Sequence, residues 1–239
     1  MSIRKHIPNT ITSMNLLSGV VGVILALKGD IRVAFLLMLL AAVFDFFDGF
    51  AARLLGAYSE IGKELDSLAD DVSFGVLPAV MMFAISGSDF APLRYVPLLI
   101  AAFSALRLAK FNIDERQHSS FIGLPTPASA VVCGSLAYLV TARPDCLVAS
   151  WCAGPVFIPA LSLVLCWLLV SEIPMFAMKI ATGDRTSKVQ KIERFAFLAV
   201  AAVSAVCVGL SRSCWCVIPL ATFAGYILIN VIGSFFCRS

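Results

Sequence analysis

The sequence predicts an all-α fold, a polytopic membrane helix bundle of about eight transmembrane helices with both termini in the cytosol. Two observations carry this prediction. Hydrophobic residues make up 60% of the 239 residues and charged residues only 14%, whereas soluble domains carry about 25% charge. Eight stretches are also apolar over roughly the 20 residues that a spanning helix needs. They cover residues 10–28, 31–57, 62–85, 92–113, 125–142, 153–178, 194–210 and 215–236.

The third stretch is the weakest by hydropathy, because five charged residues lie in its first ten: Lys63, Glu64, Asp66, Asp70 and Asp71. We keep it because residues 72–85 are apolar and because omitting it spoils the charge distribution. With a cytosolic N-terminus, 13 basic residues fall on the cytosolic side and 5 on the outer side, as the positive-inside rule requires. The prediction is one membrane domain over 1–239, with a core near 8–180 and two further helices within 194–236.

Charge and cysteine content argue against two kinds of partner. The formal net charge is +3 and the basic residues are scattered through predicted loops, so we expect no nucleic acid. None of the eight cysteines forms a C-x-x-C pair or lies at zinc-ligand spacing from a histidine, which argues against zinc. The start of the chain, MSIRKHIPNT, has no cleavage site after a short apolar core, so we expect a retained cytosolic segment.

Four aspartates stand in apolar surroundings between residues 45 and 70. Asp45 and Asp48 are three apart on the second predicted helix, and Asp66 and Asp70 are four apart on the third, so each pair shares a helix face. The connection near 56–61 is short, so the two helices should be antiparallel neighbours. Asp48 and Asp70 then lie at the same depth, about 12 Å from the cytosolic end. The four carboxylates should therefore converge on one point.

Clustered carboxylates repel one another unless cations compensate their charge. Oxygen-only ligands suit hard ions such as Mg²⁺, Mn²⁺ or Ca²⁺, and two such ions about 4 Å apart are a known arrangement for displacement at phosphorus. Small residues such as Gly49 and Ala52 leave room for a ligand, and Arg53 can reach a phosphate. Two alternatives are an ordinary buried polar cluster and the proton or cation pathway of a transporter.

The stretch DFFDGFAARLLGAYSEIGKELDSLAD, residues 45–70, resembles the signature of the CDP-alcohol phosphotransferases at every fixed position. These membrane enzymes transfer a phosphatidyl or related group from a CDP-linked lipid to an alcohol and release CMP. The resemblance implies that the four aspartates hold two divalent ions, Mg²⁺ or Mn²⁺, and that Asp70 is the general base for the incoming hydroxyl. It also implies a CDP-lipid site made of Gly49, Ala52, Arg53, Ser59, Asn9 and Thr12. Capping of the first helix is an equal alternative for the residues of its first turn, Asn9 among them.

Further stretches resemble the membrane-embedded bacterial phosphatidylserine synthases within this family. They are GKELDSLAD with VSFGVLPA, RLAKFNI at 107–113, FIGLPTPASA at 121–130 and SEIPMFAMK at 171–179. This resemblance implies free serine as the acceptor, bound by Arg107, Lys110 and Asn112. By position alone, Arg107 and Lys110 could equally be cations that mark the membrane boundary. Asp71 departs from the subfamily, where an apolar residue is more usual, and we expect it to face away from Asp70.

The expected function is transfer of the phosphatidyl group from CDP-diacylglycerol to L-serine, giving phosphatidylserine and CMP at the cytosolic face of the inner membrane. The lipid bilayer is the other expected partner, and the sequence leaves open whether the chain is a monomer or a homodimer. Within the same family, the alternative is another acceptor, inositol phosphate or glycerol phosphate, which should demand a denser basic pocket. From a different class, the alternative is a metal or proton transporter built on the same acids.

Overall fold

The computed structural model describes residues 6–87, 91–113, 121–175, 188–211 and 214–236. This part of the chain is almost entirely helical, as predicted, and its one strand pair has two residues in each strand. The elements in chain order are α1 (His6–Leu27), α2 (Ile31–Leu55), α3 (Glu60–Asp70), the π-helical turn η2 (Asp71–Val76), α4 (Leu77–Ala84), α5 (Ala91–Tyr95), the 3₁₀ turn η3 (Val96–Leu98), α6 (Leu99–Ile113), β1 (Phe121–Ile122), α7 (Thr126–Ala142), α8 (Leu147–Cys152), α9 (Phe157–Val170), β2 (Pro174–Met175), α10 (Lys188–Ser211) and α11 (Val217–Phe236).

Four helices are long and apolar enough to cross a membrane: His6–Leu27, Ile31–Leu55, Glu60–Ala84 and Pro92–Ile113. They confirm the first four predicted segments, including the charge-rich third one, which runs without a break through α3, η2 and α4. The other predicted segments correspond to apolar helices of 10–17 residues, which are Thr126–Ala142, Phe157–Val170, Phe197–Gly209 and Val217–Gly233. The total of eight spanning helices and the cytosolic location of both termini therefore stay predictions.

The predicted helix over 153–178 is wrong beyond Val170, and residues 176–178 of that prediction lie outside the described residues. α9 ends at Val170 because Ser171 is extended and Pro174 follows. A residue that precedes proline disfavours the helical conformation, so the helix cannot continue through Ile173. The chain instead forms β2, which pairs antiparallel with β1. Gly123 follows β1 with a positive φ of 76°, and its N–H donates to the carbonyl of Ile173.

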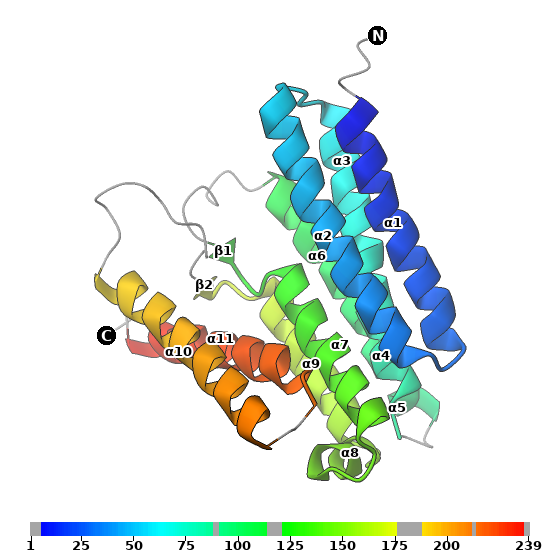
Figure 1. Cartoon of the computed structure of the whole chain (residues 1–239), viewed down its shortest axis with the longest axis vertical. Coiled ribbons are helices and arrows are strands. Elements are labelled where there is room, and N and C mark those ends of the chain that lie inside the picture. Colours follow the sequence, from blue (N-terminus) through cyan, green and yellow to red (C-terminus); the bar gives the residue numbers. More distant parts are fainter. Residues whose placement is uncertain (1–5, 88–90, 114–120, 176–187, 212–213, 237–239) are drawn as a thin grey trace.

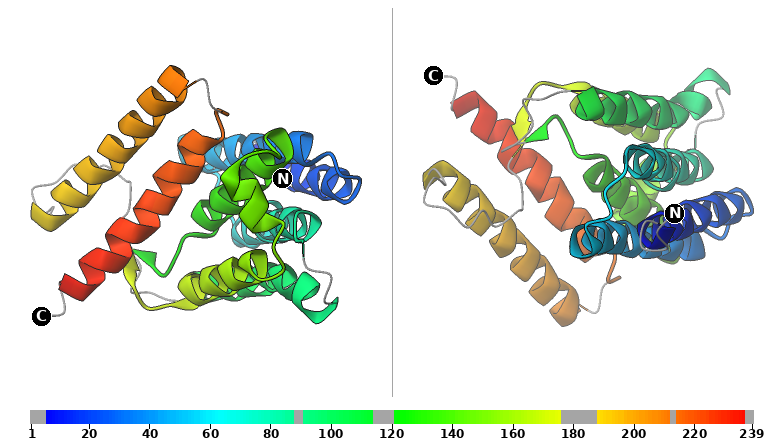
Figure 2. Two further views of the ribbon diagram at one scale, coloured as in Figure 1. Left: turned by 90° about the horizontal axis from the view of Figure 1, so that it is seen from below. Right: turned by 90° about the horizontal axis from the view of Figure 1, so that it is seen from above.

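The first helices stand side by side and α7 lies near the middle of the fold (Figure 1). α1 packs against α2 and along the whole α3–η2–α4 helix, and α7 contacts α2, α4 and α11. α2 and α3 run in opposite directions, as predicted, and each packs against α1, whereas their described residues make little direct contact with each other. Figure 2 shows α10 and α11 as a pair beside this bundle, with their axes strongly tilted relative to those of the first helices.

The buried face of α1 carries small and polar side chains rather than large apolar ones. Its buried residues are Pro8, Thr12, Asn15, Ser18, Gly19, Gly22 and Ala26. Small residues allow two helix backbones to approach closely, which is how helices associate in lipid. A Cβ atom at Gly19 would collide with Ser73, and one at Gly22 would lie 2.7 Å from a Leu77 methyl group. Glycines therefore set the distance from α1 to η2 and α4.

Candidate active site

Three of the four predicted carboxylates meet in space. Asp45 and Asp48 lie one turn apart near the end of α2, and Asp66 lies in the second turn of α3. Each offers one oxygen, and the three oxygens lie within 4.8 Å of one another. The predicted convergence of the two helix faces is confirmed for these residues.

The three carboxylates fit a divalent cation with oxygen ligands. Asp48 is only 5% exposed. One oxygen of Asp48 and one of Asp66 are buried without a hydrogen-bond partner among the described residues. Buried carboxylate oxygens are costly unless a donor or a cation satisfies them. Like charges at this distance also repel, so a hard ion such as Mg²⁺ or Mn²⁺ would satisfy both requirements.

Asp70 lies beside this trio but outside the group of three close oxygens. It is the last residue of α3, one turn after Asp66. Its Oδ1 accepts a hydrogen bond of 3.2 Å from the side-chain amide of Asn15. Its charge interacts with the charges of the trio and with that of Arg107. Asp70 is thus within electrostatic reach of both the carboxylates and a buried cation.

Asp71 lies apart from the other four acids. Its Oδ1 is buried near Gly75, where it would come within 2.7 Å of an added Cβ. The expectation that Asp71 points away from Asp70 is consistent with this placement.

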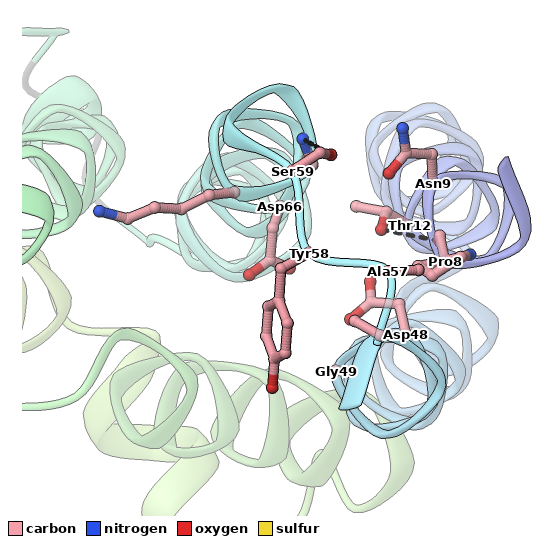
Figure 3. Close-up of a pocket in the computed structure, with 12 residues that line it drawn as sticks. Pro8, Asn9, Thr12, Asp48, Gly49, Ala57, Tyr58, Ser59 and Asp66 are labelled. Carbon is pink, nitrogen blue, oxygen red and sulfur yellow. Dashed lines mark hydrogen bonds between the residues drawn. The ribbon is translucent and has the colours of Figure 1, made fainter. Parts of the chain in front are cut away.

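An open cleft of about 580 Å³ lies between α1, the end of α2 and the start of α3. Figure 3 shows Asp48 and Asp66 pointing into it, with the Thr12 side chain beside Asp48. We call it the first cleft. Its lining residues are Pro8, Asn9, Thr12, Asp48, Gly49, Ala52, Ala57, Tyr58, Ser59, Gly62, Lys63 and Asp66. Five of the six residues predicted to bind a CDP-lipid are among them.

Local structure explains the shape of the first cleft. Ser59 is the N-cap of α3, and its hydroxyl accepts the Gly62 N–H at 3.0 Å. A Cβ at Gly62 would lie 3.0 Å from Asn9 Oδ1, so glycine lets α1 and α3 close this end. Arg53, the sixth predicted residue, does not line the cleft. Its side chain is exposed and donates to the carbonyl of Gly49 at 2.9 Å.

A second cleft of about 710 Å³ opens on the other side of Asp66, between α3, α6 and the start of α7. Its lining residues are Lys63, Asp66, Ser67, Asp70, Arg107, Leu108, Phe111, Asn112, Pro125 and Pro127. The two clefts have Lys63 and Asp66 in common. Of these two shared residues, Asp66 belongs to the carboxylate cluster. The two clefts therefore meet at this cluster.

The second cleft contains two of the three residues predicted to bind serine. Arg107 is 7% exposed, and its guanidinium donates to the Thr126 hydroxyl at 3.3 Å and lies over the Phe111 ring. The Asn112 amide donates to the Ser67 hydroxyl at 2.9 Å. The third residue, Lys110, is exposed and is not part of the lining.

Lys63 lines the second cleft and Lys110 does not. The sequence analysis did not assign Lys63 to the serine site. Its ammonium group donates to the carbonyl of Asn112 at 3.3 Å. A signal was present, because Lys63, Asp66 and Asp70 follow one another at helical spacing and share a face of α3. Tyr226 of α11 was also missed. It is buried, and its hydroxyl lies close enough to interact with the charge of Arg107.

Residues 5–167 match the protein family described as CDP-alcohol phosphatidyltransferase. The chain is 35% identical over 181 residues to a CDP-diacylglycerol–serine O-phosphatidyltransferase of Mycobacterium leprae, covering 72% of this chain and 58% of that protein. It is 34% identical over 173 residues to the Bacillus subtilis protein of the same name, covering 71% and 89%. It is also 36% identical over 135 residues to an archaetidylserine synthase of Methanothermobacter thermautotrophicus, covering 54% and 56%. The chain thus spans less than two thirds of the Mycobacterium leprae and Methanothermobacter proteins.

Proposed function

Because this chain belongs to the CDP-alcohol phosphatidyltransferase family, we propose that it transfers the phosphatidyl group of CDP-diacylglycerol to L-serine. The products are phosphatidylserine and CMP. The names of its relatives in bacteria support serine as the acceptor. The observation that carries the proposal is the pair of clefts that meet at Asp66, since a transferase has to hold a donor and an acceptor at one reacting centre.

The first cleft is the proposed donor site. Asn9, Thr12, Gly49, Ala52 and Ser59 surround the space next to Asp48, and in this proposal they contact the CDP portion of the lipid. Arg53 binds a phosphate after its side chain leaves the Gly49 carbonyl. The acyl chains of the lipid stay in the bilayer, beside the exposed apolar faces of α1 and α2.

The carboxylates are the proposed metal ligands. Asp45, Asp48 and Asp66, together with Asp70, would hold two divalent ions, Mg²⁺ or Mn²⁺. When bound, these ions would neutralise the charge of the diphosphate and of the departing CMP.

The second cleft is the proposed serine site. A buried guanidinium suits a carboxylate because its donors lie in a planar fork, so Arg107 binds the carboxylate of serine and Lys63 adds a second positive charge. Asn112, which also lines the cleft, orients the acceptor, and Lys110 attracts it from outside the lining. Asp70 lines this cleft together with Asp66, so in this proposal it accepts the proton of the serine hydroxyl.

The reaction is a direct displacement at phosphorus. Asp70 accepts the hydroxyl proton of serine, and the serine oxygen bonds to the phosphorus that carries diacylglycerol. The bond from that phosphorus to the bridging oxygen of the diphosphate breaks, and CMP leaves with the electron pair. We place this reaction at the cytosolic face of the inner membrane, because basic residues dominate the side on which the carboxylates lie.

The test is CMP release by the purified protein in detergent with CDP-diacylglycerol and Mg²⁺ or Mn²⁺. We expect release that requires L-serine and yields phosphatidylserine in equal amount. Asp70→Asn is expected to lower kcat by about 10²-fold or more, the usual contribution of a general base. Release with glycerol 3-phosphate or inositol phosphate but not with serine would overturn the acceptor. Metal transport into sealed vesicles without nucleotide would overturn the proposal that the protein is an enzyme.

A further inference from the structure

Asn15 is a buried amide that neither cleft contains. It lies in the middle of α1 and is 0% exposed. A buried amide inside a membrane bundle is costly unless it is hydrogen-bonded. The Asn15 Nδ2 atom donates to Asp70 Oδ1 at 3.2 Å, while Asn15 Oδ1 has no partner within the described part of the chain. The protein thus retains a half-satisfied amide whose side-chain bond goes to the carboxylate next to the metal-binding trio.

The segment after Asp70 is held against the same residue. Residues 71–76 form the π-helical turn η2, and such turns are rare and often lie at functional sites. The Ser73 hydroxyl donates to the backbone carbonyl of Asn15 at 3.1 Å. Two residues three positions apart, Asp70 and Ser73, therefore bind the side chain and the backbone of one asparagine.

Close packing fixes η2 from two sides. On the side of α1, Gly19 leaves room for Ser73, and any larger residue there would collide with it. On the side of α6, a Cβ at Gly75 would lie 2.9 Å from the Ser104 side chain. The backbone of the turn that follows Asp70 therefore has little freedom to move. With the backbone fixed, the orientation of the Asp70 carboxylate depends on its hydrogen bond from Asn15.

From these contacts we propose that Asn15 is a positioning residue, which holds the Asp70 carboxylate in place beside the trio. Asparagine suits this task for an electrostatic reason. A lysine would add a cation that competes with a bound metal ion, and an aspartate would add a negative charge to a cluster that already repels itself. The amide donates a hydrogen bond and leaves the net charge of the cluster unchanged.

This inference rests on the proposed function for the role of Asp70 as the base. Since Asn15 lines neither cleft, its loss should affect turnover rather than substrate binding. Asn15→Leu keeps the approximate size and removes the donor. We expect kcat to fall about 10²-fold, the order expected for a misplacement of about 1 Å, with KM for serine and CDP-diacylglycerol within about twofold of the starting protein. Asn15→Gln, which keeps an amide donor, should recover part of kcat.

Ser18→Ala is the matched control. Ser18 lies on the same buried face of α1, and its hydroxyl donates to the carbonyl of Met14 within the helix. It should leave both kcat and KM unchanged. An equal loss of kcat in Ser18→Ala, or a loss in Asn15→Leu that appears only in KM, would overturn the positioning role.

A measurement without substrate separates this inference from the proposed function. Thermal unfolding of Asn15→Leu, Asp70→Leu and the double variant forms a double-mutant cycle. If Asn15 and Asp70 hold each other, the second substitution should lower Tm less in the background of the first. Additive shifts in Tm would overturn the inference even if the enzyme uses serine. Non-additive shifts in a protein that releases no CMP would overturn the proposed function alone.

Discussion

Gly49 has no side chain at the point where α2 borders the first cleft. It lines that cleft, and among the described residues no atom beyond its chain neighbours and the nearby backbone of α2 lies within 4 Å of a Cβ added there. A larger residue would therefore extend into the cleft without disturbing its neighbours. The packing of the helices therefore does not require glycine at this position, and we infer that its small size keeps the cleft open.

We predict that Gly49→Leu raises KM for CDP-diacylglycerol at least about tenfold, equivalent to a loss of about 1.4 kcal/mol in binding. The fold should be preserved because leucine favours a helix more than glycine does. Gly209→Leu is the control, since this glycine also lies in a helix with open space around it. If KM for CDP-diacylglycerol, measured by CMP release, is unchanged in the Gly49 variant, the CDP-lipid does not bind in the first cleft.

Two lysines near the second cleft give contrasting predictions. Lys63 lines the cleft and Lys110 does not, although the sequence favoured Lys110. Lys63→Met should raise KM for serine about fivefold, the order of an exposed charge pair, because it removes a cation and keeps the aliphatic stem. Lys110→Met should change KM for serine less than twofold. The reverse order in the CMP assay would restore the sequence-based assignment.

At the scale of single elements, sequence patterns predicted the helices best where the hydrophobic run was long. The segments that became α1 and α2 were predicted to within a few residues. The charge-rich third helix was also predicted, because its apolar second half was recognised beside the acids. The segment over 153–178 failed because hydropathy stays high past Val170, whereas the backbone preference set by Pro174 ends the helix.

The candidate site was predicted where spacing along one helix determines which side chains lie together. Asp45, Asp48 and Asp66 follow from helical periodicity and a short turn. Asn15 could not be predicted in the same way. Its contact with Asp70 spans 55 positions and depends on the close approach of α1 that Gly19 allows. The π-helical geometry of η2 likewise follows from packing on two sides rather than from a residue pattern.

The short helix α8 lies at the end of the bundle away from the turn between α2 and α3 (Figure 1). Cys146 is its N-cap, and the sulfur accepts the Ala149 N–H at 3.4 Å. Cys152 is its last residue and is fully buried. Burial, together with the nearby Cys146, raises the pKa of the Cys152 thiol to about 11.

This raised pKa predicts the pH dependence of labelling. Maleimides react with the thiolate, so a variant with Cys152 as its only cysteine should react slowly at pH 7. Because the raised pKa keeps the thiol protonated, its rate should increase about tenfold per pH unit from pH 7 to pH 10. A variant that retains only Cys146 is the comparison. A rate that levels off for Cys152 near pH 9 would contradict the raised pKa.

At the scale of the whole molecule, the membrane topology can be tested through two cysteines. The predicted topology puts Cys146 on the outer side and Cys237, which lies outside the described residues, in the cytosol. In intact cells, an impermeant maleimide should label a variant that retains only Cys146. A variant that retains only Cys237 should be labelled only after permeabilisation. Labelling of Cys237 in intact cells would contradict an even number of spanning helices.

The C-terminal pair α10 and α11 lies beyond residues 5–167, the part that matches the family. It still contacts the core, since α11 packs against α7 and Tyr226 belongs to the same buried cluster as Leu124 and Ala128. The ring of Tyr226 meets those of Phe197 and Phe223. Tyr226 is also among the groups whose charge acts on Arg107, a residue that lines the second cleft.

The two clefts have separate walls except at Lys63 and Asp66. For the proposed reaction, this arrangement lets either substrate enter while the other is already bound. We therefore predict a ternary complex and no phosphatidyl-enzyme. Double-reciprocal plots of initial rate against serine concentration, at several fixed concentrations of CDP-diacylglycerol, should give intersecting lines. Parallel lines would mean that CMP departs before serine arrives, and the two clefts would then be filled in turn.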